Sequence, residues 1–371
     1  EGIAIHYTDD ITLAPKDADI IVYTPAIPKE HSELQYYRQH GYALLKRSDV
    51  LGIITRSSFN ICVAGTHGKT TITTMIAHIL RDTGYGCNAF LGGIAANYNS
   101  NFWSSSNNVC VIEADEYDRS FLKLSPDIAV ISAMDADHLD IYGTAKEMEH
   151  AFIDFSARIK TGGTLFSKYG LKREAELKAA HHFTYSRESE KADVHVKNII
   201  ADNGAYTFDI VLPEKTIKDI RLNMGGLHNV ENASAAIAIA SRLSIDDEKI
   251  KAAVANFKGV KRRFEYIVPV TDSDSIVYVD DYAHHPAELE ALIGSAKLLF
   301  PQKKCTVIFQ PHLFSRTKDF ADAFAASLDL ADETVLLPVY PARELPMAGV
   351  TSELISGKMK NASHSVKTKE E

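Results

Sequence analysis

The feature that most constrains the fold of this chain is a short glycine-containing loop, Gly65-Thr66-His67-Gly68-Lys69-Thr70-Thr71. It follows the β-branched run at residues 61–64 and precedes a helical pattern, TITTMIAHIL. At such a strand–loop–helix junction, backbone N–H groups and the helix dipole both favour an anion. Lys69 would neutralise the β- and γ-phosphates of a nucleotide, and the Thr70 hydroxyl would bind Mg²⁺. Val63 replaces the usual first glycine, so the alternative is a chance Gly-Lys-Thr, but strand, loop and helix agree on a phosphate loop.

Short apolar runs alternate with helical patterns along the chain, which predicts an α/β fold with mostly parallel sheets. A length of 371 residues exceeds what one hydrophobic core organises. We predict three domains, at residues 1–57, 58–262 and 263–371. The first contains IAIHY, ADIIVYTPAI, HSELQYYRQHG and ALLKR, half of a doubly wound domain, and a polar stretch at residues 55–60 predicts a break after it. The third contains the strand-like runs SIVYVDDYAHHP, CTVIFQPH and ETVLLPVYP.

Three further segments have recognisable patterns. The run ADVHVKNIIADNGAYTFDIVL alternates apolar and polar residues around Asp-Asn-Gly, which predicts an antiparallel hairpin at a sheet edge. The alanine-rich residues 232–243 predict a long helix, and residues 259–264 a hinge. The polar tail from Lys358 is expected to be exposed.

Composition excludes several classes of protein. A net charge of -9 argues against a general nucleic-acid surface, which needs a basic stripe. No apolar run is long enough to span a membrane and no signal peptide is visible, so we expect no membrane partner. The four cysteines have no C-x-x-C spacing, and we expect them to be buried and reduced.

Two predicted strands are followed by side chains that can bind a metal. NVCVIEADE places Glu113 just past one strand, and DIAVISAMDADH places His138 beyond the next. Ligands bind at the carboxyl ends of parallel strands, so we expect both residues near the phosphate loop. A carboxylate suits Mg²⁺ well and an imidazole less so. The alternatives are a surface strand end for Glu113 and a helix cap for His138.

Polar residues around the long helix and the hinge are further candidates. Asn229 and Asn232 are three residues apart, on one face of the first turn of the helix, where the alternative is capping. Lys261-Arg262-Arg263 lies in the predicted hinge. It is either a solvated basic cluster or supplies an arginine that clamps phosphates on domain closure.

Two motifs of the third domain follow predicted strands in the same way. They are Asp280-Asp281-Tyr282-Ala283-His284-His285-Pro286 and Gln310-Pro311-His312 with Arg316 one turn later. Neither has the closed spacing of a zinc site. No Gly-x-Ser-x-Gly elbow appears, which disfavours covalent enzyme catalysis.

Taken in order, GTHGKTT, EADE, DADH, HNVENA, GVKRRF, DDYAHHP and FQPH-x-x-SRT resemble the motifs of the Mur ligases of peptidoglycan synthesis. They are most similar to the branch that joins L-alanine to UDP-N-acetylmuramate, and the matches extend over residues 24–344. The resemblance implies a partial Rossmann-like UDP-binding domain at residues 1–57. It also implies a central phosphate-loop ATPase domain at residues 58–262 and a Rossmann-like amino-acid-binding domain at residues 263–371.

The resemblance assigns a role to each motif. The residues implied in ATP binding are Gly65, Thr66, His67, Gly68, Lys69, Thr70, Thr71, His228, Asn229, Asn232, Arg263 and Asp281. The implied magnesium ligands are Thr70, Glu113 and His138. The implied catalytic residues are Lys69, His138, Arg263, His284 and His285. His284, His285 and Arg316 would bind the amino acid.

The implied reaction is ATP-dependent ligation of L-alanine to the lactyl carboxylate of UDP-N-acetylmuramate, through an acyl phosphate, in the bacterial cytoplasm. The protein would be a monomer or a weak homodimer. Leu313 stands where some members carry a second arginine, so binding of the alanine carboxylate rests on Arg316. The glycine-rich UDP loop is expected upstream of residue 1, and the C-terminal domain is expected to be incomplete at its end. The alternatives are a sibling ligase that attaches a recycled peptide, a phosphate-loop kinase or ATPase, and a nucleotide-binding regulator without catalysis.

Overall fold

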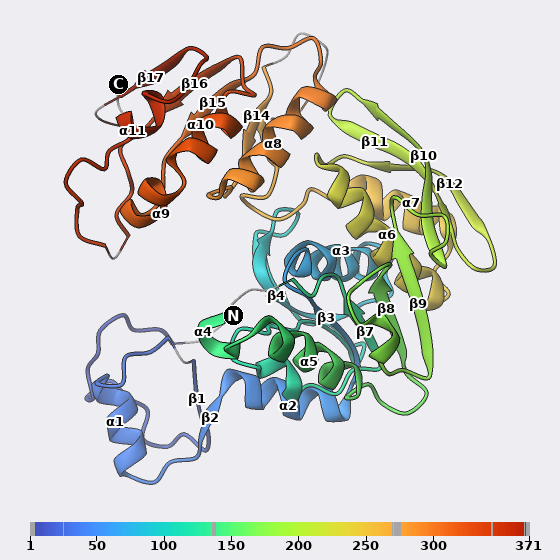
Figure 1. The fold of residues 1–371 in the computed structure, drawn as a ribbon. Coiled ribbons are helices and arrows are strands. Elements are labelled where there is room, and N and C mark those ends of the chain that lie inside the picture. Colours follow the sequence, from blue (N-terminus) through green and yellow to red (C-terminus); the bar gives the residue numbers. More distant parts are fainter. Residues whose placement is uncertain are drawn as a thin grey trace. The chain divides into compact units, whose positions relative to one another are not determined.

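The computed structural model describes residues 4–24, 26–135, 139–268, 270, 276–342, 344–366 and 368. Internal contacts divide the chain into two units. Unit 1 comprises Glu1–Lys69 and Asn108–His182, and unit 2 comprises Thr70–Asn107 and Phe183–Glu371. Figure 1 follows the elements of both units along the chain. The three domains predicted from the sequence, with bounds at residues 57 and 262, stay a prediction.

Unit 1 is built around a parallel sheet. Its strands lie in the order β8 (Thr164–Lys168), β7 (Ile128–Ile131), β3 (Phe59–Ala64) and β6 (Val109–Glu113). Each neighbouring pair is parallel. Strands buried on both faces need apolar side chains throughout, which explains the continuous apolar runs in the sequence. The prediction of a mostly parallel α/β fold is confirmed.

Helices of unit 1 pack on a short 3-10 helix, η1 (Ser120–Lys123). Phe121 of η1 stacks on Phe155 and meets Phe152 edge-on, and both partners belong to α5 (Ala145–Ser156). The Thr144 hydroxyl caps α5 by accepting a hydrogen bond from the Glu147 N–H at 3.2 Å. The unit also contains α2 (Arg47–Ser57), α4 (Leu139–Tyr142) and η2 (Glu174–Glu176).

The N-terminal segment, blue in Figure 1, forms less structure than the sequence predicted. β1 (Ile21–Tyr23) and β2 (Leu44–Lys46) pair in parallel, with α1 (Ser32–Gln39) between them in the chain. The predicted strand IAIHY is wrong for its described residues, which form no strand. Ile5 is 68% exposed and Tyr7 is 94% exposed, so the apolar side chains of that run have no packing surface.

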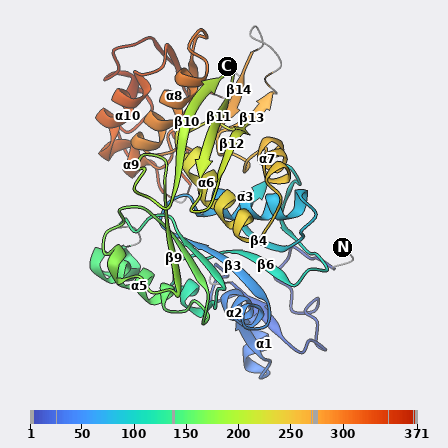
Figure 2. The same ribbon diagram turned by 90° about the vertical axis from the view of Figure 1, so that its right-hand side faces the viewer.

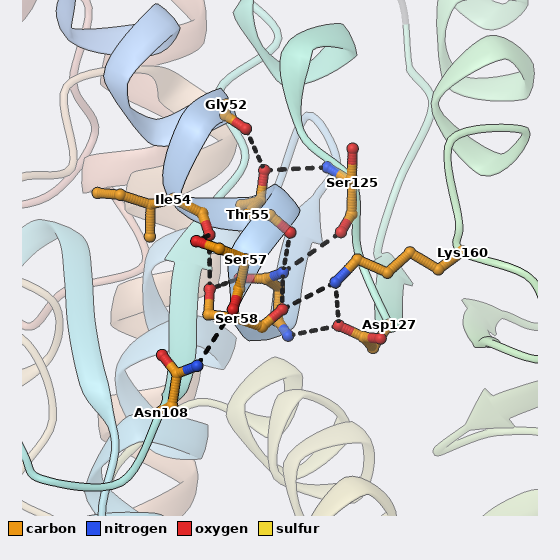
Figure 3. A network of polar contacts seen from close by, with 10 residues as sticks. Gly52, Ile54, Thr55, Ser57, Ser58, Asn108, Ser125, Asp127 and Lys160 are labelled. Atoms are coloured by element: carbon orange, nitrogen blue, oxygen red, sulfur yellow. Dashed lines mark hydrogen bonds and ion pairs between the residues drawn. The ribbon is translucent and has the colours of Figure 1, made fainter.

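The polar stretch at residues 55–60, where we predicted a break, has a defined structure, and the domain boundary expected there stays a prediction. It forms the end of α2 and the start of β3, and its buried side chains, those of Thr55, Ser58 and Asn60, take part in a hydrogen-bonded network (Figure 3). The Asn60 amide donates to the carbonyls of Thr55 at 2.6 Å and Ser58 at 2.8 Å. Asp127 accepts from the Asn60 N–H at 2.8 Å and from Lys160 at 2.8 Å. Polar residues can therefore be buried between α2 and β3, because their hydrogen-bonding groups pair with one another.

We expect Asn60→Ala to lower the free energy of unfolding by about 1–3 kcal/mol, because buried carbonyls lose their donor. Urea denaturation of both forms measures the difference. Asn108→Ala is the matched control, since Asn108 donates to Ser57 at 3.1 Å from an exposed position. The control should change stability by less than about 0.5 kcal/mol. Equal losses in the two variants would contradict a special contribution of the buried network.

Unit 2 contains the predicted hairpin. β10 (Val194–Asp202) and β11 (Ala205–Val211) are antiparallel, and Asn203 and Gly204 turn between them with φ of 42° and 82°. Two successive positive φ angles match the tight turn that Asn-Gly favours. A third strand, β12 (Thr216–Leu222), continues the meander and is the edge strand, which the sequence did not predict (Figure 2).

Other strands and helices of unit 2 come before and after this meander in the sequence. β9 (His181–Ser186) pairs with β10 in parallel through Tyr185 and Ser186, and β4 (Asn88–Ala95) pairs with β5 (Ser100–Trp103) in antiparallel fashion. The helices are α3 (Lys69–Asp82), α6 (Leu227–Arg242) and α7 (Asp247–Asn256). The predicted alanine-rich helix is confirmed as part of α6. None of the described helices is long and apolar enough to span a membrane.

The C-terminal part of unit 2 has its own core. β15 (Thr306–Phe309), β16 (Glu333–Leu336) and β17 (Ser363–Ser365) are parallel, and β13 (Glu265–Val268) is antiparallel to β14 (Tyr278–Asp280). The helices are α8 (Pro286–Leu299), α9 (Phe314–Asp319), α10 (Ala321–Leu328) and α11 (Glu353–Ser356). The polar tail from Lys358 is mostly exposed, as expected, and its residues Ser363–Ser365 also form β17.

Candidate functional site

The phosphate loop has the predicted context: β3 ends at Ala64 and α3 begins at Lys69. A side chain at Gly65 would place its Cβ 2.2 Å from the Ser132 Oγ, and the φ of Gly65 is +134°. Only glycine therefore allows this close approach to the residues that follow β7. Thr66 donates its N–H to the Ala133 carbonyl at 3.2 Å, and the Ser132 hydroxyl donates to the carbonyl of His67. Contacts within unit 1 thus fix the loop. Ser132 was not predicted, because only the tertiary structure brings it to the loop.

Lys69 is held at the start of α3 by two acceptors. Its Nζ lies 2.7 Å from the Gly65 carbonyl and 2.7 Å from Oε1 of Glu116. The Glu116 side chain is 1% exposed, and burial raises the pKa of its carboxyl while Lys69 acts in the opposite direction. Glu116 belongs to the EADE motif, but sequence reasoning assigned a role only to Glu113. Its burial beside the loop lysine becomes visible only in the fold.

Two of the predicted metal ligands lie on described elements, β6 and α3. Glu113 is the last residue of β6 and lies opposite Val63 of β3 in the parallel register. Thr70, the residue after Lys69, is buried in the first turn of α3. His138 lies outside the described residues. Both described residues offer oxygen atoms, which fit the preference of Mg²⁺.

His67 and Gly68 complete the loop. The His67 side chain is 73% exposed and its Nε2 lies 3.6 Å from a carboxylate oxygen of Asp135. Gly68 has a φ of +80°, a conformation that favours glycine before the helix starts. Their assignment to ATP binding stays a prediction.

Unit 2 contains a basic cavity of about 260 Å³. Its lining residues are Thr70, Gly92, Gly93, Val260, Lys261, Arg262, Arg263 and Tyr282. Backbone hydrogen bonds hold the basic segment along β4, from the Lys261 N–H to the Ile94 carbonyl at 2.9 Å and from the Ala96 N–H to the Gly259 carbonyl at 3.0 Å. Three consecutive cations around one cavity favour an anionic ligand such as a phosphate or a carboxylate. The side chains of all three residues are exposed, so the phosphate-clamp interpretation stays a prediction beside the solvated cluster.

Asp281 organises the segment that follows this cavity. Its carboxylate accepts hydrogen bonds from the N–H groups of Phe264 and Ala283, both at 2.7 Å. Burial raises the pKa of Asp281, whereas these two bonds and the nearby Arg263 oppose the shift. Asp281 therefore ties Phe264, at the end of the predicted hinge, to Ala283, and it lies close enough to Arg263 for the two charges to interact.

The HNVENA motif is partly buried within unit 2. His228 is exposed, whereas Asn229 is 2% exposed and Asn232 is 8% exposed. The Asn232 amide donates to Asn229 at 3.1 Å, and the Asn229 amide donates to the Gly225 carbonyl at 2.7 Å. The helix N-cap is Gly226, so neither asparagine takes the capping position that was the alternative. Their contact with a nucleotide stays a prediction.

The structure brings Arg316 and His284 together through a third residue, His312. Nη1 of Arg316 lies 3.5 Å from Nδ1 of His312, and the rings of His284 and His312 are 6.2 Å apart. Tyr340 stacks on His312 with ring centroids 5.6 Å apart. Burial and the adjacent Arg316 lower the pKa of His312. This cluster combines one guanidinium with aromatic walls, which suits a small carboxylate-bearing molecule.

His285 has a different environment from its neighbour. Its ring packs on Phe320 with centroids 5.0 Å apart. Its backbone N–H donates a hydrogen bond of 3.0 Å to the carboxylate of Glu288, which lies at the start of α8. Consecutive residues before a helix diverge in direction, so adjacency in the sequence did not place both histidines against Arg316. His312 is the residue that sequence reasoning noted only as a strand end. Its position within reach of Arg316 makes it a further candidate for the amino-acid site.

The strand–loop–helix with its partly buried lysine defines a protein of the phosphate-loop class. Two family models match the chain, the Mur ligase middle domain over residues 63–240 and the Mur ligase, glutamate ligase domain over residues 262–371. This chain belongs to the Mur ligase family, which confirms the resemblance drawn from its motifs.

Individual relatives give the same result. The chain is 46% identical to a UDP-N-acetylmuramate–L-alanine ligase of Cytophaga hutchinsonii, over 100% of this chain and 80% of the relative. It is 47% identical to one of Parabacteroides distasonis, over 100% of this chain and 81% of the relative. Among solved structures, the UDP-N-acetylmuramate-alanine ligase of Thermotoga maritima matches with a TM-score of 0.81 at 28% identity, covering 99% of this chain and 80% of that one.

Proposed function

We propose that this chain ligates L-alanine to the lactyl carboxylate of UDP-N-acetylmuramate, with conversion of ATP to ADP and phosphate. The observation that carries the proposal is the fixed phosphate loop with Lys69 at its end. It occurs in a chain that is 42% to 47% identical to relatives named UDP-N-acetylmuramate–L-alanine ligase. Because the reaction consumes ATP, we expect it to take place in the bacterial cytoplasm. We expect the enzyme to be a monomer or a weak homodimer.

The chemistry follows from the charges of the site. A carboxylate is a poor acyl donor, so its oxygen first attacks the γ-phosphorus of ATP and the bond from that phosphorus to the β–γ bridging oxygen breaks. Lys69 and Arg263 would stabilise the charge that develops on the phosphate oxygens. The alanine amine then attacks the acyl phosphate, and inorganic phosphate leaves. His284, which lies beside the Arg316–His312 pair, would accept the proton of the amine in its neutral form.

Thr70 and Glu113 would hold Mg²⁺ through oxygen atoms, with His138 as the third predicted ligand. When bound, the ion lowers the negative charge that the phosphates present to the attacking carboxylate. Within the described residues, no cluster of three or more His, Cys, Asp or Glu side chains forms a metal site by itself. Magnesium is usually bound by a few protein oxygens together with the phosphate oxygens of the nucleotide. Thr70 and Glu113 therefore fit this ion.

Glu113→Ala should raise the magnesium concentration needed for half-maximal activity by roughly 10- to 100-fold, because the ion loses a carboxylate. Magnesium titrations at fixed ATP measure the shift. Asp154→Ala is the control, since Asp154 is a carboxylate of α5 that is 52% exposed and lies 3.8 Å from His150. An unchanged magnesium requirement in the Glu113 variant would remove this residue from the metal site.

Phosphate release with UDP-N-acetylmuramate and single amino acids tests the reaction, with mass spectrometry of the product. Release that requires both L-alanine and UDP-N-acetylmuramate, with the mass of the amide product, supports the proposal. Preference for a peptide over alanine would identify the sibling ligase. A phosphorylated product without an amide bond would identify a kinase, and nucleotide binding without turnover would identify a regulator.

A further inference from the structure

Glu116 is the buried partner of the phosphate-loop lysine. Oε1 of Glu116 lies 2.7 Å from the Lys69 Nζ, and the two side chains are 1% and 15% exposed. A charge pair removed from water is poorly screened, so each partner strongly influences the other. Lys69 therefore carries a counter-charge within the protein, supplied by a residue other than the predicted metal ligands.

The backbone of Glu116 is anchored so that the carboxylate cannot move away with the chain. Its carbonyl accepts hydrogen bonds from the Tyr142 hydroxyl at 2.6 Å and from the Arg119 N–H at 2.9 Å. Tyr142 is buried, and the Arg119 guanidinium lies over its ring at 4.8 Å. The carboxylate is thus held next to the loop whichever ligand Lys69 contacts.

The second carboxylate oxygen, Oε2, is buried and has no hydrogen-bond partner among the described residues. A buried carboxylate with one unsatisfied oxygen depends on its remaining partner, and loss of that partner is costly. Phosphates that draw the Lys69 ammonium towards themselves therefore compete with Glu116. They are also repelled by its charge, and the repulsion grows with the negative charge of the ligand.

A nucleoside triphosphate without a metal carries roughly twice the negative charge of its magnesium complex. We propose that Glu116 makes the phosphate loop select the metal-bound nucleotide, because its buried charge restrains Lys69 and penalises the more negative, metal-free form. Glu116 is then a positioning and selectivity residue, which touches Lys69 and neither the substrate nor the metal. The inference rests on the proposed binding of ATP by this loop.

A purely structural ion pair predicts a different outcome. Its removal would lower the stability of the protein. It would also weaken the binding of the metal-free and the metal-bound nucleotide by the same factor, because the loop would be less well ordered. A selectivity role changes the ratio of the two dissociation constants. The ratio therefore distinguishes the two roles, whereas activity alone would not.

The experiment is calorimetric titration of the chain with a non-hydrolysable ATP analogue, once with excess Mg²⁺ and once with EDTA. In Glu116→Gln, which keeps the size of the side chain and removes its charge, we expect the ratio of the metal-free to the metal-bound Kd to fall by about tenfold. Glu116→Asp retains the charge and should retain most of the preference. If thermal melting shows that Glu116→Gln does not fold, Glu116→Ala, which buries no polar group, takes its place.

Asp115→Asn is the matched control, because it removes one negative charge from the adjacent position, which is exposed. It should change the ratio by less than about twofold, since water screens its charge. An unchanged ratio in the neutral Glu116 variant would overturn the inference while leaving nucleotide binding intact. Absence of binding by the parent chain in both conditions would instead overturn the proposed function, and this inference with it.

Discussion

Lys69→Ala should lower kcat for ligation by at least roughly 100- to 1000-fold, the usual effect of removing one preorganised group that stabilises transition-state charge. Lys69 begins α3, and its ammonium donates a hydrogen bond to the carbonyl of Gly65, the first residue of the loop. Alanine cannot replace this charge. Steady-state phosphate release at saturating substrates measures the loss.

The same variant should also become less stable, in a manner that depends on pH. Without Lys69 the buried Glu116 has no cation, so the pKa of its carboxyl, already raised by burial, should rise further. A carboxyl whose pKa is raised in the folded state stabilises the fold below the pKa of the unfolded chain. That contribution is lost as pH rises towards and through the folded pKa. Thermal melts of the variant should therefore shift to lower temperature between mildly acidic and neutral pH, and those of the parent much less.

Two controls separate the catalytic loss from the loss of stability. The double variant Lys69→Ala with Glu116→Gln removes both charges, so it should recover stability at neutral pH and remain inactive. Lys123→Ala removes a lysine from an exposed pair with Asp49, at 2.6 Å, and should keep activity within about twofold. Recovery of activity in the double variant, or normal activity in Lys69→Ala, would contradict the assignment of the loop.

The sequence was sufficient to predict the parts of the fold that local pattern determines. A β-branched run, two glycines and a helical pattern specify the loop before α3, and Asp-Asn-Gly specifies the turn between β10 and β11. The parallel pairing of β3 and β6 places Glu113 opposite Val63, so both lie near the carboxyl ends of their strands, where ligands bind to parallel sheets. These predictions depend on residues near one another in the chain.

Other features depend on contacts between distant residues, and the sequence could not show them. Asn60 belongs to a polar stretch, and the sequence could not show that it is buried, because its partners, Asp127 and the Thr55 carbonyl, meet it only after folding. Glu116 looked equivalent to the other acids of its motif until burial beside Lys69 distinguished it. The isolated run at Ile5 lacked a surface to pack on, so its apolar pattern produced no described strand.

The second large effect is expected at the amino-acid end of the site. Arg316→Lys should raise the KM for alanine by roughly 10- to 150-fold, which corresponds to about 1.5–3 kcal/mol for a hydrogen-bonded charge. A carboxylate is bound best by the two parallel N–H groups of a guanidinium, and an ammonium cannot reproduce that fork. Arg316 is half-buried in α9 beside His312, and Leu313 in the preceding turn supplies no charge.

The KM for ATP should change little in this variant, because the loss is confined to recognition of the alanine carboxylate. Lys318→Ala is the matched control, since Lys318 is an exposed cation of the same short helix, and both KM values should stay within about twofold. The two KM values are measured with the other substrates saturating, so that each reports one ligand. A parallel rise in the KM for ATP would make Arg316 a nucleotide-binding or structural residue. An unchanged KM for alanine would leave the His284–His312 cluster without its proposed ligand.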